Sequence, residues 1–362
     1  MSIPKIRFKD KEGLEFPSWE LSSIENFVEK IHSGRSKKNK TGCFDLYGAT
    51  GLIGRSDSFD CNGEFVLAAR VGSIGVLNLP SGKYAVSDNT LIFEHNELTI
   101  PQFLYYRLSL FDWYSVATGT SQKVVSAGRL KKSKLFWCSP EEQQKIASFF
   151  STLDQKIELN ERKLEVLEKL KKGLMQKFFK QELRFKSPEN RDYPEWEVQK
   201  LEKLCSTFKS GSSITQKSIF EAGAYPVYGG NGLRGYTDTY THDGEYALIG
   251  RQGALCGNLK YVKGKTYISE HAIAVQANSE NSTQWLYYRL KEMNLNKLSE
   301  SSAQPGLSAK KLKEILINTP CLEEQIRIAN FLACFDEQIK LCTNKLFMLQ
   351  QLKRSFLRQM FV

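Results

Sequence analysis

The side chains in this sequence that could do chemistry are cations and amides in polar, glycine-containing loops. Arg70 and Arg251 each come directly after a segment that we predict to be a buried strand and lie two residues before a glycine. An arginine so placed can pair with a guanine edge, although many such arginines only hold a phosphate or brace a turn. Gln122 and Gln304 lie in matching polar segments and suit adenine or a phosphate oxygen, with capping of a following helix as the alternative. These residue types favour binding to nucleic acid over catalysis.

Two further loops, 33–38 and 209–213, combine glycine, hydroxyl groups and cations. Their backbone N–H groups and charges are of the kind that bind phosphate. His271 stands where the first half of the chain has Asn89. Because the residue type differs between the two copies, this position suits variable recognition of DNA better than a role in a catalytic pair. The residues that we predict to face DNA are Ser33, Gly34, Arg35, Lys37, Lys38, Tyr47, Thr50, Arg70, Gly72, Ser73, Gln122 and Lys123, then Lys209, Ser210, Ser212, Ser213, Tyr228, Asn231, Arg251, Gly253, His271 and Gln304.

Catalytic motifs do not accompany these loops in the sequence. There is no G-x-x-x-x-G-K-[ST] loop for ATP and no Asn/Asp-Pro-Pro-aromatic motif of the adenine-methyltransferase kind. The eight cysteines include no C-x-x-C pair, which argues against a zinc site. We therefore predict no catalytic residue, metal or cofactor in this chain. A fused or degenerate methyltransferase is the enzymatic alternative.

Composition sets the class of protein. The chain has 362 residues, of which 41% are hydrophobic, enough for more than one folded core. Its 51 Lys and Arg against 40 Asp and Glu give a formal charge of +11, which favours an acidic partner such as DNA. The sequence contains no run of about 18 apolar residues, so we expect a cytoplasmic protein without a membrane partner.

The strongest feature of the sequence is an internal duplication. The shift between matching residues is 177 from Trp19 to Trp196 and 182 from Asp154 to Asp336, so the copies are colinear with short insertions. The matching segments are Phe16–Glu20 with Tyr193–Glu197, Tyr47–Leu52 with Tyr228–Leu233, Leu104–Leu108 with Leu286–Leu290, and Glu141–Gln143 with Glu323–Gln325.

Each copy divides into a globular part and a long helix. Short apolar runs such as 65–69 and 246–249 predict buried strands, and 100–110 and 283–293 predict short helices, so we expect a mixed α/β (α+β) fold. We place the domains at 1–138, 139–186, 187–320 and 321–362.

The second and fourth of these segments carry apolar residues at alternating spacings of three and four. This heptad pattern predicts helices at 141–182 and 323–361 that form a coiled coil. Equivalent copies related by a pseudo-two-fold axis require the helices to be antiparallel, with one globular domain at each end. Leu322 stands where the first copy has Pro140, a difference that could change where the second helix begins.

Two related but divergent modules at a fixed separation suit the reading of two different DNA half-sites. A stand-alone repressor-like protein with two half-site modules remains an alternative. A purely structural coiled-coil linker would not need the two loop-rich globular regions.

The ordered set of motifs resembles the specificity subunit of type I restriction–modification systems over nearly the whole chain, twice. The set comprises Pro-x-Trp-Glu, Tyr-Gly-x-x-Gly-Leu, Arg-x-Gly, Leu-Tyr-Tyr-Arg-Leu and Glu-Glu-Gln. The resemblance implies two target recognition domains for the halves of an asymmetric site and helices that set the unread spacer. It also implies that 141–182 and 323–361 dock two methyltransferase subunits, which use S-adenosylmethionine. Translocating and cleaving subunits that use ATP and Mg²⁺ would join them.

Overall fold

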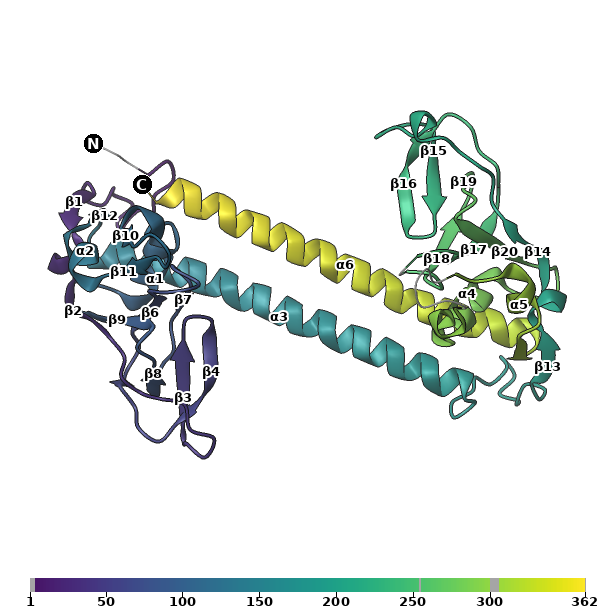
Figure 1. Ribbon diagram of the computed structural model, residues 1–362, viewed down its shortest axis with the longest axis horizontal. Helices are drawn as coiled ribbons and strands as arrows, with labels where there is room; N and C mark the ends of the chain where they lie inside the picture. The colour runs from purple at the N-terminus through teal and green to yellow at the C-terminus, as the bar shows by residue number, and fades with distance from the viewer. Residues whose placement is uncertain (1–3, 254, 300–305, 362) are drawn as a thin grey trace. The chain divides into compact units, whose positions relative to one another are not determined.

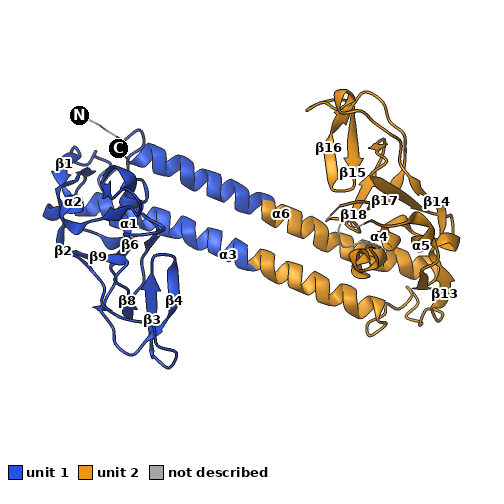
Figure 2. Ribbon diagram, viewed as in Figure 1, with its two compact units in different colours: residues 1–162, 344–362 blue, residues 163–343 orange. Residues whose placement is uncertain are grey.

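The computed structural model describes residues 4–253, 255–299 and 306–361. It divides into two compact units (Figure 2): unit 1 is residues 1–162 and 344–362, and unit 2 is residues 163–343. Each unit contains one globular region and a part of each of the two long helices.

The long helices are α3 (Pro140–Phe179) and α6 (Leu322–Met360). In unit 1, Phe149 of α3 packs on Phe356 of α6, and Gln350 of α6 donates a hydrogen bond to Glu161 of α3. Partner positions rise on one helix as they fall on the other, which confirms the predicted antiparallel pair. Unit 2 repeats this order, with Phe178 of α3 against Phe331 of α6 and Lys171 paired with Asp336.

The second long helix begins at the position equivalent to the start of the first, because Leu322 lies 182 residues after Pro140. The missing proline therefore does not move the helix start. The side-chain amide of Gln143 donates to the carbonyl oxygen of Cys138, and that of Gln325 donates to that of Pro320. Each glutamine satisfies a backbone group just before the helix, so the helix start does not depend on proline.

The globular region of unit 1 contains two four-stranded sheets (Figure 1). The first is antiparallel, in the order β2 (Val28–Ser33), β9 (Thr90–His95), β6 (Val66–Ala69), β7 (Leu77–Asn78). The second runs β4 (Gly51–Ser56), β3 (Phe44–Gly48), β8 (Lys83–Val86), β5 (Cys61–Asn62), with β3 and β8 parallel. The remaining elements are β1 (Glu20–Ser23) paired with β12 (Lys134–Trp137), β10 (Ala117–Thr118) paired with β11 (Val124–Val125), α1 (Pro101–Ser109), α2 (Ala127–Lys132), and single helical turns at Ile24–Asn26 and Trp113–Ser115.

Unit 2 repeats this plan with small changes. Its main sheet runs β14 (Cys205–Ser210), β20 (Ala272–Ala277), β17 (Glu245–Gly250), β18 (Leu259–Lys263). A second sheet runs β16 (Gly232–Thr237), β15 (Tyr225–Gly229), β19 (Tyr267–Ile268). The remaining elements are β13 (Glu197–Lys200) paired with β21 (Leu316–Thr319), α4 (Thr283–Glu292), α5 (Ala309–Lys313), and helical turns at Leu201–Leu204, Gln216–Ser218 and Leu295–Leu298.

One hydrophobic core in each unit joins the globular region to the long helices. In unit 1, Trp19 and Phe103 of the globular region are buried together with Phe150 of α3 and Phe361, which follows α6. In unit 2, Trp285 is buried with Phe179 of α3 and Leu332 of α6. Each long helix therefore belongs to the folded core of both units, which explains why the repeat includes the helices.

Candidate nucleic-acid interface

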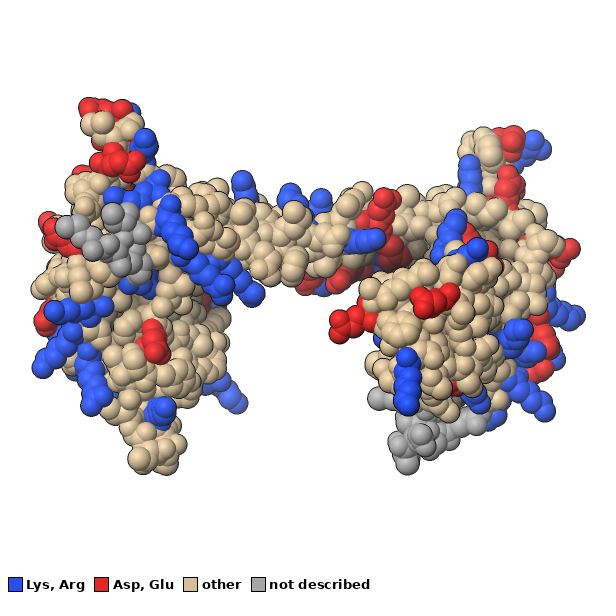
Figure 3. All heavy atoms as spheres, turned by 90° about the horizontal axis from the view of Figure 1, so that it is seen from above, with Lys and Arg blue, Asp and Glu red and all other residues tan. Residues whose placement is uncertain are grey.

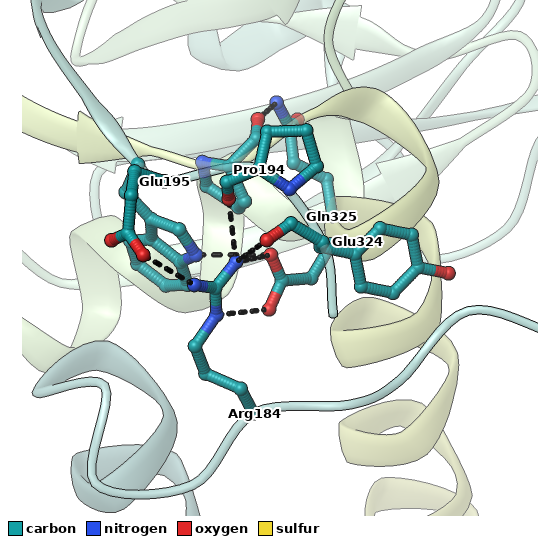
Figure 4. A network of polar contacts seen from close by, with 8 residues as sticks. Arg184, Pro194, Glu195, Glu324 and Gln325 are labelled. Carbon is teal, nitrogen blue, oxygen red and sulfur yellow. Dashed lines mark hydrogen bonds and ion pairs between the residues drawn. The ribbon is translucent and has the colours of Figure 1, made fainter. Parts of the chain in front are cut away.

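A buried ion pair fixes the globular region of unit 2 to the start of α6 (Figure 4). The Nε and Nη2 atoms of Arg184 donate to the two carboxylate oxygens of Glu324 at 3.1 and 2.8 Å. Trp196 donates its indole N–H to the same carboxylate at 3.0 Å, and Arg184 also donates to the carbonyl oxygen of Pro194 at 2.6 Å. The Glu324 side chain is fully buried, and its hydrogen bonds raise the pKa of Arg184 above its usual value. A charge so completely paired gives the segment a single position.

Unit 1 contains the same arrangement. Arg7 donates to both oxygens of Glu142 at 3.0 and 2.8 Å, and Trp19 donates to Glu142 at 3.1 Å. Arg7 also donates to the carbonyl oxygen of Pro17 at 2.7 Å. The short segments that precede each globular region are therefore held in the same way.

A second repeated contact ties the short helix of each globular region to both long helices. The hydroxyl of Tyr106 donates to Asp154 at 2.8 Å, and Lys353 of α6 pairs with the same carboxylate. In unit 2, Tyr288 donates to Asp336 at 2.6 Å, and Lys171 of α3 completes the cluster. Burial is the first cause that raises the pKa of both tyrosines. Both tyrosines are buried in the core of their unit.

Three adjacent strand ends meet at one edge of the main sheet of unit 1. Ser33 ends β2, Arg70 follows β6, and Asn89 precedes β9. The register places Ser33 opposite Leu91 and Ala69 opposite Thr90, and the backbone N–H of Arg70 donates to the carbonyl oxygen of Asn89 at 3.0 Å. The sheet thus brings together predicted residues that are far apart in the sequence.

The equivalent edge of unit 2 gathers Ser210, Arg251 and His271. The backbone N–H of Arg251 donates to the carbonyl oxygen of His271 at 3.0 Å, and its Nη1 donates to the hydroxyl of Ser210 at 3.4 Å. Arg251 and His271 are exposed. A cation, a hydroxyl and an imidazole therefore share a solvent-facing edge, where they can donate to phosphates or to base edges.

The Tyr-Gly-x-x-Gly-Leu motif forms the turn of a hairpin in each unit. Gly48 pairs with Gly51 between β3 and β4, which leaves Ala49 and Thr50 as the turn. In unit 2, Gly229 pairs with Gly232, and Asn231 lies at the turn. Gly51 and Gly232 have φ of 98° and 104°, values that favour glycine. Thr50 and Asn231 are exposed.

The tyrosine that opens each hairpin motif is partly buried. Burial raises the pKa of both Tyr47 and Tyr228. Each ring packs against the apolar cluster of its own unit and is only partly buried.

Several backbone N–H groups of the two glycine loops donate hydrogen bonds within the protein. The N–H groups of Gly34 and Ser36 donate to the carbonyl oxygens of Thr90 and Val86, and that of Arg35 donates to the carboxylate of Asp60. In unit 2 the N–H groups of Gly211 and Ser212 donate to the carbonyl oxygens of Ala272 and Ile268. These particular N–H groups are therefore occupied within the protein.

Both loop glycines are needed for close approach of two backbone segments. A methyl group on Gly34 would lie 2.0 Å from the carbonyl oxygen of Val86, and one on Gly211 would lie 2.2 Å from that of Ile268. Arg35, Lys37, Lys38 and Lys209 are exposed, as are Ser212 and Ser213. The glycines allow the close approach that places these exposed side chains.

The turn after each arginine and the segment around Gln122 lie beside the same edges. Gly72 and Gly253 have φ of 71° and 82°, and Ser73 accepts a backbone hydrogen bond from Val76 in the turn. Val71 pairs with Val124, two residues after the exposed Gln122, and Lys123 lies over the ring of Tyr114. Gln304 lies outside the described residues.

Sequence reasoning did not select Arg234 or Gln252, which line a hollow of about 230 Å³ with Gly229, Gly230, Asn231 and His271. The duplication alone could have indicated them, because it aligns these two polar residues with the apolar residues Ile53 and Val71. A position that is apolar in one copy and polar in the other was open to detection before the fold was known.

Charge and ligand-forming groups complete the description of the surface. Lysine and arginine side chains project from both globular regions (Figure 3). Among the described residues, histidine, cysteine and acidic side chains form no group of three that could hold a metal ion. No helix in the described part of the chain is both long and apolar enough to cross a membrane.

Comparison with known proteins places these features in a family. A model described as the type I restriction modification DNA specificity domain matches residues 18–169 and again 193–351. The chain is 45% identical over 132 residues to the type I restriction enzyme EcoprrI specificity subunit of Escherichia coli, covering 35% of this chain and 33% of that protein. It is 27% identical over 390 residues to the putative type I restriction enzyme MjaX specificity subunit of Methanocaldococcus jannaschii, covering 92% and 91%.

Several of these alignments are partial. The chain spans about a third of the length of the E. coli relative and of a putative specificity subunit of Haemophilus influenzae. The fold is similar to the crystal structure of a type I restriction–modification S subunit from M. genitalium, with a TM-score of 0.79 at 19% identity, covering 100% of this chain and 99% of that one.

Proposed function

Because this chain belongs to the type I restriction–modification DNA specificity family, we propose that it is the subunit that selects the DNA sequence in such a system. Each globular region reads one half of a bipartite, asymmetric site in double-stranded DNA. The observation that carries the proposal is the contrast between the copies. The contacts that fix each globular region to the helices are repeated. The positions beside the sheet edge and hairpin change type, from Ile53, Val71 and Asn89 in unit 1 to Arg234, Gln252 and His271 in unit 2.

The proposed DNA-facing surface of unit 1 is the edge where β2 and β6 end and β9 begins, together with the adjacent hairpin turn. In unit 2 it is the edge where β14 and β17 end and β20 begins, with its hairpin turn. Arg70 and Arg251, the loop cations around Arg35 and Lys209, and the turn residues Thr50 and Asn231 contribute side chains to it. Phosphate contacts from the cations would position the DNA, and contacts to base edges would set the sequence.

The long helices are proposed to dock two methyltransferase subunits, because each unit exposes the same apolar set. Three pairs of exposed apolar side chains are separated by 182 residues: Leu159 (64% exposed) and Leu341 (56%), Val166 (61%) and Met348 (69%), Leu170 (48%) and Leu352 (45%). Unit 1 carries one member of each pair, and unit 2 carries the other. Exposed apolar side chains that recur at equivalent positions favour two equivalent partner sites.

In this proposal the chain itself is not catalytic. The partner subunits supply S-adenosylmethionine-dependent methylation of adenine and ATP- and Mg²⁺-dependent translocation and cleavage. The absence from the sequence of an ATP loop and of an adenine-methyltransferase motif supports this division of labour.

The proposal is tested by expressing this chain with its methyltransferase subunits in a host that lacks other methylation and sequencing the methylated genome. We expect one bipartite motif with two different half-sites and an unread spacer. Methylation by the isolated chain, or a single continuous motif, would contradict the proposal. Tight binding of the isolated chain to its site, unchanged by the partners, would favour a repressor-like protein.

The docking surface is tested by Leu159→Glu and Leu341→Glu, separately and together. Native mass spectrometry should show loss of one methyltransferase subunit for each single variant and of both for the double variant. Leu21→Glu is the matched control, because Leu21 is 54% exposed but lies on β1 of the globular region. Unchanged stoichiometry in the double variant would place the docking surface elsewhere.

A further inference from the structure

The two hairpins differ in the side chain that lies against their first glycine. A methyl group on Gly48 would lie 2.6 Å from Cδ1 of Ile53, and one on Gly229 would lie 2.7 Å from Cδ of Arg234. Ile53 and Arg234 therefore occupy the same place in their units. The structure puts an apolar side chain there in unit 1 and a guanidinium group in unit 2.

A second position beside the hairpin changes in the same direction. Val71 and Gln252 follow the sheet-edge arginines, and both take part in equivalent backbone bridges, Val71 with Val124 and Gln252 with Gly306. The side-chain oxygen of Gln252 lies 3.4 Å from Nδ1 of His271. Unit 1 thus has an aliphatic side chain where unit 2 has an amide in contact with an imidazole.

Together these residues make the hollow of unit 2 polar. Its side chains come from Asn231, Arg234, Gln252 and His271, all of which are exposed, and Gly229 and Gly230 contribute backbone. Arg234 also donates to the side-chain oxygen of Gln216 at 3.3 Å, which limits where the guanidinium can point. The equivalent residues of unit 1 are Gly48, Ala49, Thr50, Ile53, Val71 and Asn89.

We infer that Arg234 and Gln252 give unit 2 specificity for at least one purine in its half-site, and that unit 1 reads the corresponding position through the apolar side chains of Ile53 and Val71. The inference rests on the proposed function of the chain in DNA recognition. Arginine pairs with guanine N7 and O6, glutamine pairs with adenine N6 and N7, and aliphatic groups contact the thymine methyl. The two half-sites are therefore distinguished by different chemistry at equivalent positions.

The test uses the complex of the full chain with its methyltransferase subunits and sequences the methylated genome for Arg234→Ile and Gln252→Val. Each variant carries the residue found at the equivalent position of unit 1. We expect the preference for purine at one or two positions of the unit 2 half-site to fall about tenfold or more. The unit 1 half-site should be unchanged. Lys265→Ile is the matched control, because it removes an exposed cation of unit 2 outside the hollow.

Other outcomes separate the alternatives. A uniform fall in methylation with the same motif would make Arg234 a phosphate contact and would overturn the inference, as would a change in the unit 1 half-site. Arg234→Lys keeps the charge but loses the planar fork, so it should relax the same position even if Arg234→Ile fails to fold. Absence of a bipartite motif from the wild-type complex would instead refute the proposed function itself.

Discussion

The two units are alike where each globular region meets the long helices, and they differ around the hairpin turn and the adjacent hollow. In the Arg7–Glu142 and Arg184–Glu324 pairs, the distance from Nε to the carboxylate differs by 0.1 Å or less. The same holds for the distance from Nη2 to the carboxylate. By contrast, Ile53 and Arg234 share a position and have opposite chemistry. A buried charge tolerates only its partner, whereas an exposed side chain at a sheet edge can change at little cost to folding. The attachment to the helices is therefore constant, and the exposed residues beside the hairpins are free to diverge.

The largest expected effect comes from removing the buried carboxylates, one in each unit. Glu142→Ala and Glu324→Ala leave an arginine without its partner and should each destabilise their own unit by about 3–5 kcal/mol. Denaturant titration followed by ¹⁹F NMR of fluorotryptophan reports on the units separately, because Trp19 and Trp137 lie in unit 1 and Trp285 lies in unit 2.

The control for these variants is Glu15→Ala, because Glu15 forms an exposed ion pair with Lys9. Its removal should change stability by less than about 1 kcal/mol. If only one of Glu142→Ala and Glu324→Ala destabilises its unit, the two attachments are not equivalent and the comparison fails.

A smaller, unequal effect is expected at the lysine–aspartate clusters. The side chain of Lys171 is 9% exposed and that of Lys353 is 24% exposed. Burial lowers the pKa of Lys171, and Asp336 opposes this shift. Asp336→Asn should therefore lower the free energy of unfolding of unit 2 by about 1–3 kcal/mol. Asp154→Asn should lower that of unit 1 by less.

The same fluorotryptophan titration measures both aspartate variants. Adding Lys171→Met to Asp336→Asn should restore part of the lost stability, because the unpaired charge is removed. Equal losses for Asp154→Asn and Asp336→Asn would show that the exposure of the lysine does not set the cost.

The repeat, the helices and the mixed fold could be predicted from the sequence because each depends on local pattern. Heptad spacing identified α3 and α6 to within a few residues, and the apolar run ending at Ala69 identified β6. The antiparallel direction followed from equivalence of the copies. These properties need no knowledge of which distant residues meet.

The chemistry of the loops could not be predicted, because it depends on long-range partners. The backbone N–H of Ser36 looked available for phosphate, but the strand that contains Val86 accepts it. Similarly, no local pattern reveals that the side chain of Arg234 lies against Gly229, because that contact depends on how β15 and β16 pair in the hairpin. The sequence indicates which loops carry the candidate residues, and the fold determines which of their backbone groups are already bonded within the protein.

The smallest expected effect is a change in alkaline stability at the buried tyrosines. Burial raises the pKa of Tyr106 and Tyr288 above the ordinary value near 10, so the folded protein keeps a proton that the unfolded chain loses. The contribution of each tyrosine to the free energy of unfolding is therefore complete below about pH 10. Above pH 10 this contribution falls by about 1.4 kcal/mol for each pH unit. Tyr106→Phe and Tyr288→Phe should each flatten this fall in their own unit between pH 10 and 11. The fluorotryptophan titration repeated at pH 8, 10 and 11 measures the slope, and flattening in one unit only would show that the two clusters differ in their proton linkage.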